Sequence, residues 1–173
     1  MLGRQLLAAL IGVVVCASGG VAYGHAALNA EQAEAGALTT LEFRITHGCD
    51  GSPTTRVELA LPDGIVRASP RMLAGWTVRV EREPLAAPIT LHGQTVTERP
   101  ARIIWEGGSI PDGVYEQFEV RLETPNRPGE TVLFPVRQEC ANGGTYAWAD
   151  DPAAGTPHPA LALRLTASSG HRH

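Results

Sequence analysis

The stretch Q-F-E-V-R-L, residues 117–122, decides the fold class of this chain. Its apolar residues Phe118, Val120 and Leu122 alternate with three polar residues. Successive side chains of a β-strand point to opposite sides, so this alternation predicts a strand with one apolar face. The same period of two recurs at 41–45, 56–61, 76–81, 132–136 and 161–165. The repeated pattern predicts sheets that each pack one face on a core.

Turn sequences rich in Gly, Pro, Asn and Asp separate these runs. They are P-D-G at 62–64, A-G at 74–75, P-D-G at 111–113, N-R-P-G at 126–129 and N-G-G at 142–144. Many short strands joined by such turns predict an all-β fold, an antiparallel β-sandwich that is immunoglobulin-like in the broad sense. The 173 residues of the chain suffice for one such domain.

Residues 1–24 have the pattern of a secretory signal peptide. Arg4 is the only charged residue there, an apolar stretch runs from Leu6 to Val15, and small residues follow. The apolar stretch is shorter than the roughly 20 residues that a membrane-spanning helix needs. We therefore expect an exported protein, periplasmic or secreted, with no transmembrane segment. We expect the β-sandwich domain to cover 25–166 and a flexible tail to cover 167–173.

The cleavage position decides whether His25 is the first residue of the processed chain. Small residues are required three positions and one position before the cut. Ala22 and Gly24 satisfy this requirement for cleavage before His25, whereas Gly24 and Ala26 satisfy it for a cut that removes His25. Both cuts stay open at this point.

The chain is acidic. It has 14 basic residues, all of them arginine, against 18 acidic ones, and loss of residues 1–24 would leave a formal net charge of −5. This balance argues against nucleic acid as a partner and against electrostatic docking on anionic lipid.

Two cysteines, Cys49 and Cys140, remain after the leader, in which Cys16 lies. An even pair in an exported protein favours one disulfide. A loop of about 90 residues closed in this way is stabilised by roughly 4 kcal/mol. The alternative is a pair of thiolate ligands for a soft metal ion.

A free N-terminal histidine offers its α-amine and its imidazole Nδ1 to one metal ion. Two such nitrogens form a chelate ring that suits Cu(II), which binds most tightly among the divalent ions of its series. An internal histidine lacks the amine. If cleavage occurs before His25, the processed chain therefore begins with a copper ligand; the alternative is a solvated terminal residue.

Several motifs stand in a particular order along the chain. They are the terminal histidine, H-G-C-D-G-S-P-T-T at 47–55, R-V-E-L-A-L-P-D-G at 56–64, G-W at 75–76, V-Y-E-Q-F at 114–118 and W-A-D-D-P-A-A-G-T-P-H-P-A at 148–160. In this order they resemble the YcnI-like family of exported copper-binding proteins over nearly the whole processed chain. The resemblance implies an immunoglobulin/fibronectin-like sandwich. It also implies a monohistidine brace, in which the N-terminal histidine and a carboxylate hold Cu(II) beside a tryptophan.

The resemblance assigns these roles to individual residues. The histidine is His25, the tryptophan that forms the wall of the site is Trp148, and the carboxylate is Glu116 in V-Y-E-Q-F. Family members often have the acid immediately before the phenylalanine, where this chain has Gln117. Glu119 is the next candidate for the carboxylate. The alternatives are a solvated strand carboxylate for Glu116 and ordinary core packing for Trp148.

The other histidines have weaker claims to a metal. His47 is a ligand only if the neighbouring Cys49 is reduced, and it otherwise belongs to a turn; His92 lies in a polar loop. His158, between two prolines, could complete a two-histidine brace like that of oxidative polysaccharide-cleaving copper enzymes. The H-R-H tail at 171–173 is either a weak metal ligand or a frayed end.

The sequence has no G-x-S-x-G elbow, P-loop, dinucleotide fingerprint or H-E-x-x-H motif. We therefore expect a protein that is not an enzyme and that binds Cu(II) for copper storage, delivery or homeostasis. Its expected partners are the copper ion and other exported copper proteins. The alternatives are a copper-dependent oxidase or oxygenase that uses His158, and a metal-free interaction module, since a sandwich fold does not determine function.

Overall fold

The structure, a computed structural model, describes residues 26–46, 49, 51–91 and 93–168. These residues form twelve strands and one short 3-10 helix. The elements are β1 (Ala27–Leu28), β2 (Gln32–Glu34), β3 (Leu38–Ile45), β4 (Thr54–Ala60), β5 (Ala68–Pro70), β6 (Thr77–Leu91), β7 (Gln94–Ile110), β8 (Glu116–Glu123), β9 (Thr131–Phe134), β10 (Val136–Cys140), β11 (Thr145–Trp148), η1 (Pro152–Ala154) and β12 (Leu161–Thr166). Among them, no helix is long and apolar enough to cross a membrane.

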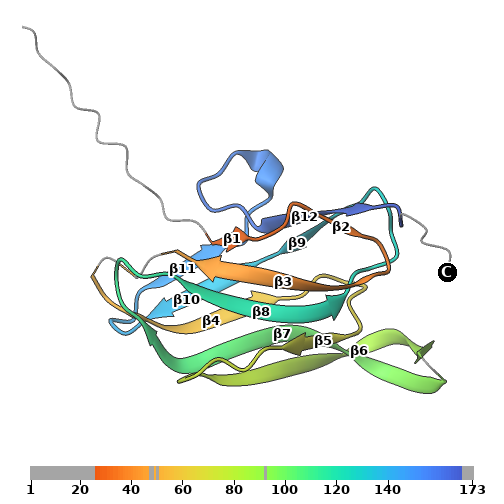
Figure 1. Cartoon of the computed structure of the whole chain (residues 1–173), viewed down its shortest axis with the longest axis horizontal. Coiled ribbons are helices and arrows are strands. Elements are labelled where there is room, and N and C mark those ends of the chain that lie inside the picture. The colour runs from red at the N-terminus through yellow and green to blue at the C-terminus, as the bar shows by residue number, and fades with distance from the viewer. Residues whose placement is uncertain (1–25, 47–48, 50, 92, 169–173) are drawn as a thin grey trace, which may run out of the picture.

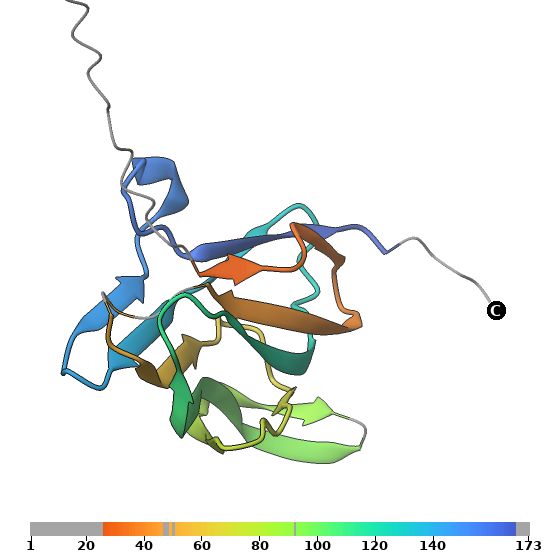
Figure 2. The ribbon, with the colours of Figure 1, turned by 60° about the vertical axis from the view of Figure 1, so that its left-hand side comes forward.

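The strands form three sheets that pack against one another as a sandwich (Figures 1 and 2). The four-stranded sheet has the order β1-β3-β8-β5, the five-stranded sheet β11-β10-β4-β7-β6, and the three-stranded sheet β2-β12-β9. All neighbouring strands are antiparallel except β2 and β12, which run parallel. The all-β sandwich predicted from the sequence is confirmed.

The alternating runs of the sequence bury their apolar residues between the sheets. Phe118, Val120 and Leu122 of β8 are fully buried, and so are Phe43 and Leu41 opposite them on β3. Aromatic rings from different sheets meet in this core. Phe43 packs on Phe134 at 5.4 Å between ring centroids, and Trp105 packs on Phe118 at 5.1 Å.

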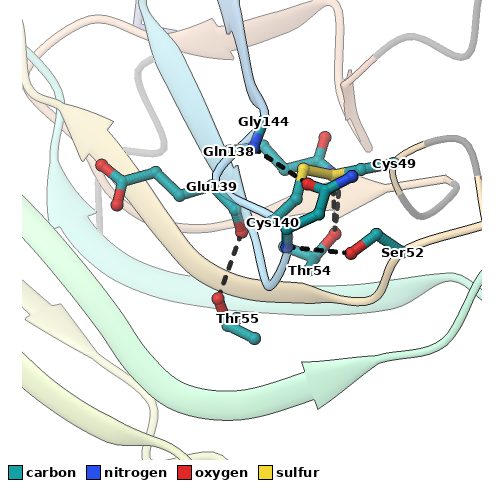
Figure 3. The surroundings of a disulfide bond; sticks show 9 residues. Cys49, Ser52, Thr54, Thr55, Gln138, Glu139, Cys140 and Gly144 are labelled. Carbon is teal, nitrogen blue, oxygen red and sulfur yellow. Dashed lines mark hydrogen bonds between the residues drawn. A yellow bond between two sulfur atoms is a disulfide. The ribbon is translucent and has the colours of Figure 1, made fainter.

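A disulfide joins Cys49 to Cys140, with 6.0 Å between the Cα atoms and 91 residues between them in sequence (Figure 3). The bond excludes both sulfurs as thiolate ligands of a metal. Beside it, the fully buried Gln138 donates from its amide to the Thr54 hydroxyl and to Cys49 Sγ. The disulfide therefore ties the segment that precedes β4 to the end of β10, beside the buried polar residues Thr54 and Gln138.

The outer face of the five-stranded sheet is covered by ion pairs. Ile104 belongs to this face, opposite Glu58 and Arg79, and is nevertheless only 1% exposed. Glu81 accepts hydrogen bonds from Arg102 and Arg79, which lower the pKa of this carboxyl. The arginine stems thus shield an outward-facing isoleucine while their charged ends stay in water.

Gly107 and Gly108 form a bulge near the end of β7. Between the pairs Arg56↔Glu106 and Thr54↔Ile110, β7 has two more residues than β4. Gly107 has a φ of 85°, in the left-handed region. At Gly108, a Cβ atom would come within 2.0 to 2.4 Å of three ring atoms of Trp76. Trp76 also packs edge-on against Phe118, so the missing side chain at residue 108 gives the indole its place over the core.

Replacing Gly108 by alanine is expected to destabilise the fold by about 1–3 kcal/mol, the usual cost of overpacking. The new methyl group would displace Trp76 from its position on Phe118. Chemical denaturation measures the change in the free energy of unfolding. Ser109→Ala, at the exposed neighbouring position, is the matched control and should change stability little. Equal stabilities for G108A and S109A would contradict this account.

Candidate functional site

The expected ligand His25 lies outside the described residues, and the described chain begins at the next residue. Ala26 is 5% exposed and belongs to the hydrophobic core. Ala27 and Leu28 then form β1 and pair with Arg44 and Phe43 of β3. The chain that immediately follows His25 is therefore held at the edge of the four-stranded sheet.

Asn29 completes this attachment at the end of β1. Its backbone N–H donates to the carbonyl of Glu42 at 3.1 Å, and its side-chain Oδ1 accepts the N–H of Glu42 at 3.0 Å. A two-residue strand would be weak alone. The asparagine adds a side-chain hydrogen bond and fixes the direction in which β1 runs.

Glu116 is the first residue of β8 and lies opposite Ile45, the last residue of β3. Ala27 lies opposite Arg44, which in turn lies opposite Gln117. The start of β1 and the start of β8 are therefore at the same end of the sheet, with only β3 between them. Two steps of about 4.8 Å separate these strands.

The side of the sheet to which Glu116 belongs follows from the pleat. Glu116 and Phe118 are two residues apart, so both belong to the face that looks toward the core. The Glu116 side chain is partly exposed at the rim, and its Oε1 accepts the N–H of Gln117 at 2.9 Å. Glu116 thus offers a carboxylate at the rim of the sandwich interior.

Trp148 is the last residue of β11 and lies opposite Val136 on β10. It is 1% exposed, belongs to the same hydrophobic core as Ala26 and Ile45, and stacks on Tyr146 at 6.4 Å between ring centroids. The tryptophan is therefore a core residue at the end of β11.

The other two positions considered for the carboxylate belong to the outer face of the four-stranded sheet. The amide of Gln117 donates to Glu42 Oε2 at 3.1 Å. Glu119 is ion-paired with Arg71, three residues further from the end of the sheet than Glu116. Sequence reasoning missed Glu42 because its contact with Gln117 depends on the register of β3 against β8.

His158 lies close to Trp148 through the backbone. Its carbonyl accepts the N–H groups of Ala149 and Asp150, each at 3.1 Å, so the loop after β11 closes on itself. Asp151 caps η1 within this loop by accepting the N–H of Ala153. The structure thus brings His158 and Trp148 to one region. His47, His92 and the tail histidines lie outside the described residues.

At this end of the sandwich the described residues bring one candidate metal-binding side chain, Glu116, to the rim. Cu(II) accepts carboxylate oxygen and imidazole nitrogen as ligands, and the Glu116 carboxylate is of the first kind. No group of three or more His, Cys, Asp or Glu side chains that could hold a metal ion occurs in the part of the chain that the structure describes. A copper site here therefore needs donors from His25.

A family model with the description "Domain of unknown function (DUF1775)" matches residues 25–165. A solved structure described as an uncharacterized protein from Nocardia farcinica with an immunoglobulin-like fold is similar, with a TM-score of 0.65 and 25% sequence identity. The similarity covers 82% of this chain and 98% of that protein, and it shows the immunoglobulin-like fold. A DUF4466 family protein from Parabacteroides merdae matches with a TM-score of only 0.35 and 10% identity, over 74% of this chain and 44% of that one. No curated protein matches the chain.

Proposed function

The chain belongs to the DUF1775 family, and we propose that it is an exported protein that holds Cu(II) through a processed N-terminal histidine, for copper storage, delivery or homeostasis. The proposal rests on the resemblance to the YcnI-like family and on one observation. Ala26, the neighbour of His25, is buried at the end of the four-stranded sheet where β8 begins with Glu116.

The proposed roles follow from the chemistry of each group. Cleavage before His25 would create an α-amine next to an imidazole, and the two nitrogens would chelate the ion. Glu116 would add an oxygen ligand and neutralise part of the ion's charge. Trp148 would close the inner side of the site and limit access of water. The family match begins at residue 25, which supports the cut before His25 over the cut after Ala26.

Anchoring of β1 supports binding by reducing its entropic cost. The residues next to His25 are already paired with β3 through Ala27, Leu28 and Asn29. A ligand held on an ordered strand loses less conformational freedom on binding than one on a free tail. Preorganised attachment of this kind distinguishes a brace from the weak binding of an unstructured terminal histidine.

One additional residue ahead of His25 is expected to weaken Cu(II) binding at least about 100-fold, or about 2.7 kcal/mol. The extension would turn the amine into an amide and remove one of the two chelating nitrogens. Competition titration against a chelator of known affinity measures the change. Proteolytic removal of the extension should restore tight binding in the same sample. Unchanged affinity in the extended protein would rule out the brace.

Glu116→Gln is expected to lower the Cu(II) affinity about tenfold, a loss of about 1.4 kcal/mol. The substitution removes the negative charge and keeps an oxygen that can accept the N–H of Gln117. Glu119→Gln is the matched control, because it removes a carboxylate from the same strand that is ion-paired with Arg71. A larger loss of affinity in E119Q than in E116Q would assign the carboxylate to Glu119 and contradict the proposal.

A copper-dependent oxidase is the second candidate, favoured by the position of His158 in the loop that closes beside Trp148. For the copper carrier that we propose, His158→Ala should leave Cu(II) affinity within about twofold, less than about 0.5 kcal/mol. The copper-loaded protein should also form no peroxide with ascorbate and oxygen above a free-copper control. Peroxide formation that H158A abolishes would favour the oxidase. Absence of any copper binding by processed protein would favour a metal-free module.

A further inference from the structure

The β6–β7 hairpin extends past the rest of its sheet. β4 pairs with β7 only between Ile110 and Arg102, whereas β6 stays paired with β7 as far as Leu91 and Gln94. Figures 1 and 2 show the distal end of this hairpin, in green, reaching away from the other strands. In the described structure, the outer edge of β7 between Gln94 and Glu98 is thus paired with no strand.

The distal hairpin has no acidic residue, arginine or lysine. Between Glu83 and Glu98, residues 84–97 include no Asp, Glu, Arg or Lys. Ile89 and Leu91 of β6 share one face with Val96, which lies opposite Ile89. Ile89 is 37% exposed, so among the described residues no second layer covers this face. A two-stranded ribbon without a packed face is marginally stable in water, so added strands would stabilise it.

The two long edges of the hairpin differ in their ability to accept another strand. Pro84 and Pro88 interrupt the edge of β6, since proline has no N–H to donate. Proline is one of the usual devices that block an edge. The β7 edge over Q-T-V-T-E, residues 94–98, contains no proline, and Glu98 is its first charged residue. The β7 edge is therefore the one open to pairing.

We propose that two copies of this chain pair their β7 edges antiparallel about a two-fold axis centred on Val96. In this register Val96 lies opposite Val96 of the second copy, Thr95 opposite its Thr97, and Gln94 opposite its Glu98. Threonine pairs and amide–carboxylate pairs across strands are favourable, and no two like charges face each other. The segment is complementary to itself, as a two-fold interface requires.

Pairing of this kind would turn the ribbon into a four-stranded sheet. Opposite residues of an antiparallel pair point to the same face, so Ile89, Leu91 and Val96 of both copies would form one continuous apolar strip. The contact is small, which predicts a weak dimer that depends on protein concentration. The proposed edge lies at the Gln94 end of the 17-residue strand β7, about 50 Å along the strand from the Ile110 end. Glu116 comes shortly after Ile110 in the chain, so the copper site is expected at the opposite end of β7 from the dimer contact. The dimer would leave the candidate copper site free.

Analytical ultracentrifugation of the processed protein tests the proposal. The wild-type protein should show a reversible monomer–dimer equilibrium. The double variant T95E/T97E places like charges opposite each other across the two-fold axis at exposed positions, and it should raise the dissociation constant at least tenfold. The matched variant T95E/T97R places opposite charges at the same positions and should dimerise at least as well as the wild type.

Three results would overturn the proposal. They are a wild-type protein that stays monomeric at every concentration, a T95E/T97E variant that dimerises as tightly as the wild type, and a T95E/T97R variant that is as weak as T95E/T97E. Copper titration of T95E/T97E separates this inference from the proposed function. Its affinity for Cu(II) should equal that of the wild type whether or not dimers form.

Discussion

The candidate site depends on the register of β3 against β8. Eight consecutive pairs, from Leu38↔Glu123 to Ile45↔Glu116, fix these strands relative to each other. The buried pairs Leu41↔Val120 and Phe43↔Phe118 hold the register, because a slip by one residue would turn this apolar set toward solvent. The same slip would exchange the faces of Glu116 and Gln117. The hydrophobic core therefore determines which of the two neighbouring side chains faces the sandwich interior.

The periodic strands could be predicted from the sequence, and the short ones could not. The run at 117–122 is the centre of β8 and the run at 41–45 the end of β3, because both bury one face. β1 and β2 have two and three residues, too few to show a period. The distal part of β6 has no buried face, so its residues had no reason to alternate. An alternating sequence pattern indicates a strand with one buried face, so strands without a buried face cannot be recognised from it.

The candidate site, too, could be predicted from the sequence only in part. His25 was predicted from the leader pattern and the chemistry of a terminal histidine. Glu116 and Trp148 were predicted only through a family resemblance, since no pattern of alternation distinguishes a ligand from any other residue on a strand. Trp148 fits the core so well that packing alone explains its burial. Two contacts distinguish Glu116 from its neighbours on β8. Glu119 pairs with Arg71, 48 positions away in sequence, and Gln117 bonds to Glu42, 75 positions away. Pairings over such distances follow from strand register, which no local motif specifies.

The proposed copper site divides its requirements between processing and folding. Folding supplies a fixed strand after His25 and a carboxylate at the same end of the sheet. The amine can come only from cleavage of the peptide bond between Gly24 and His25. An uncleaved chain would thus lack the nitrogen pair even if the sandwich were fully folded. In this arrangement the folded strand limits the conformational entropy that His25 would lose on binding copper. Cleavage during export decides whether His25 has a free α-amine to bind with.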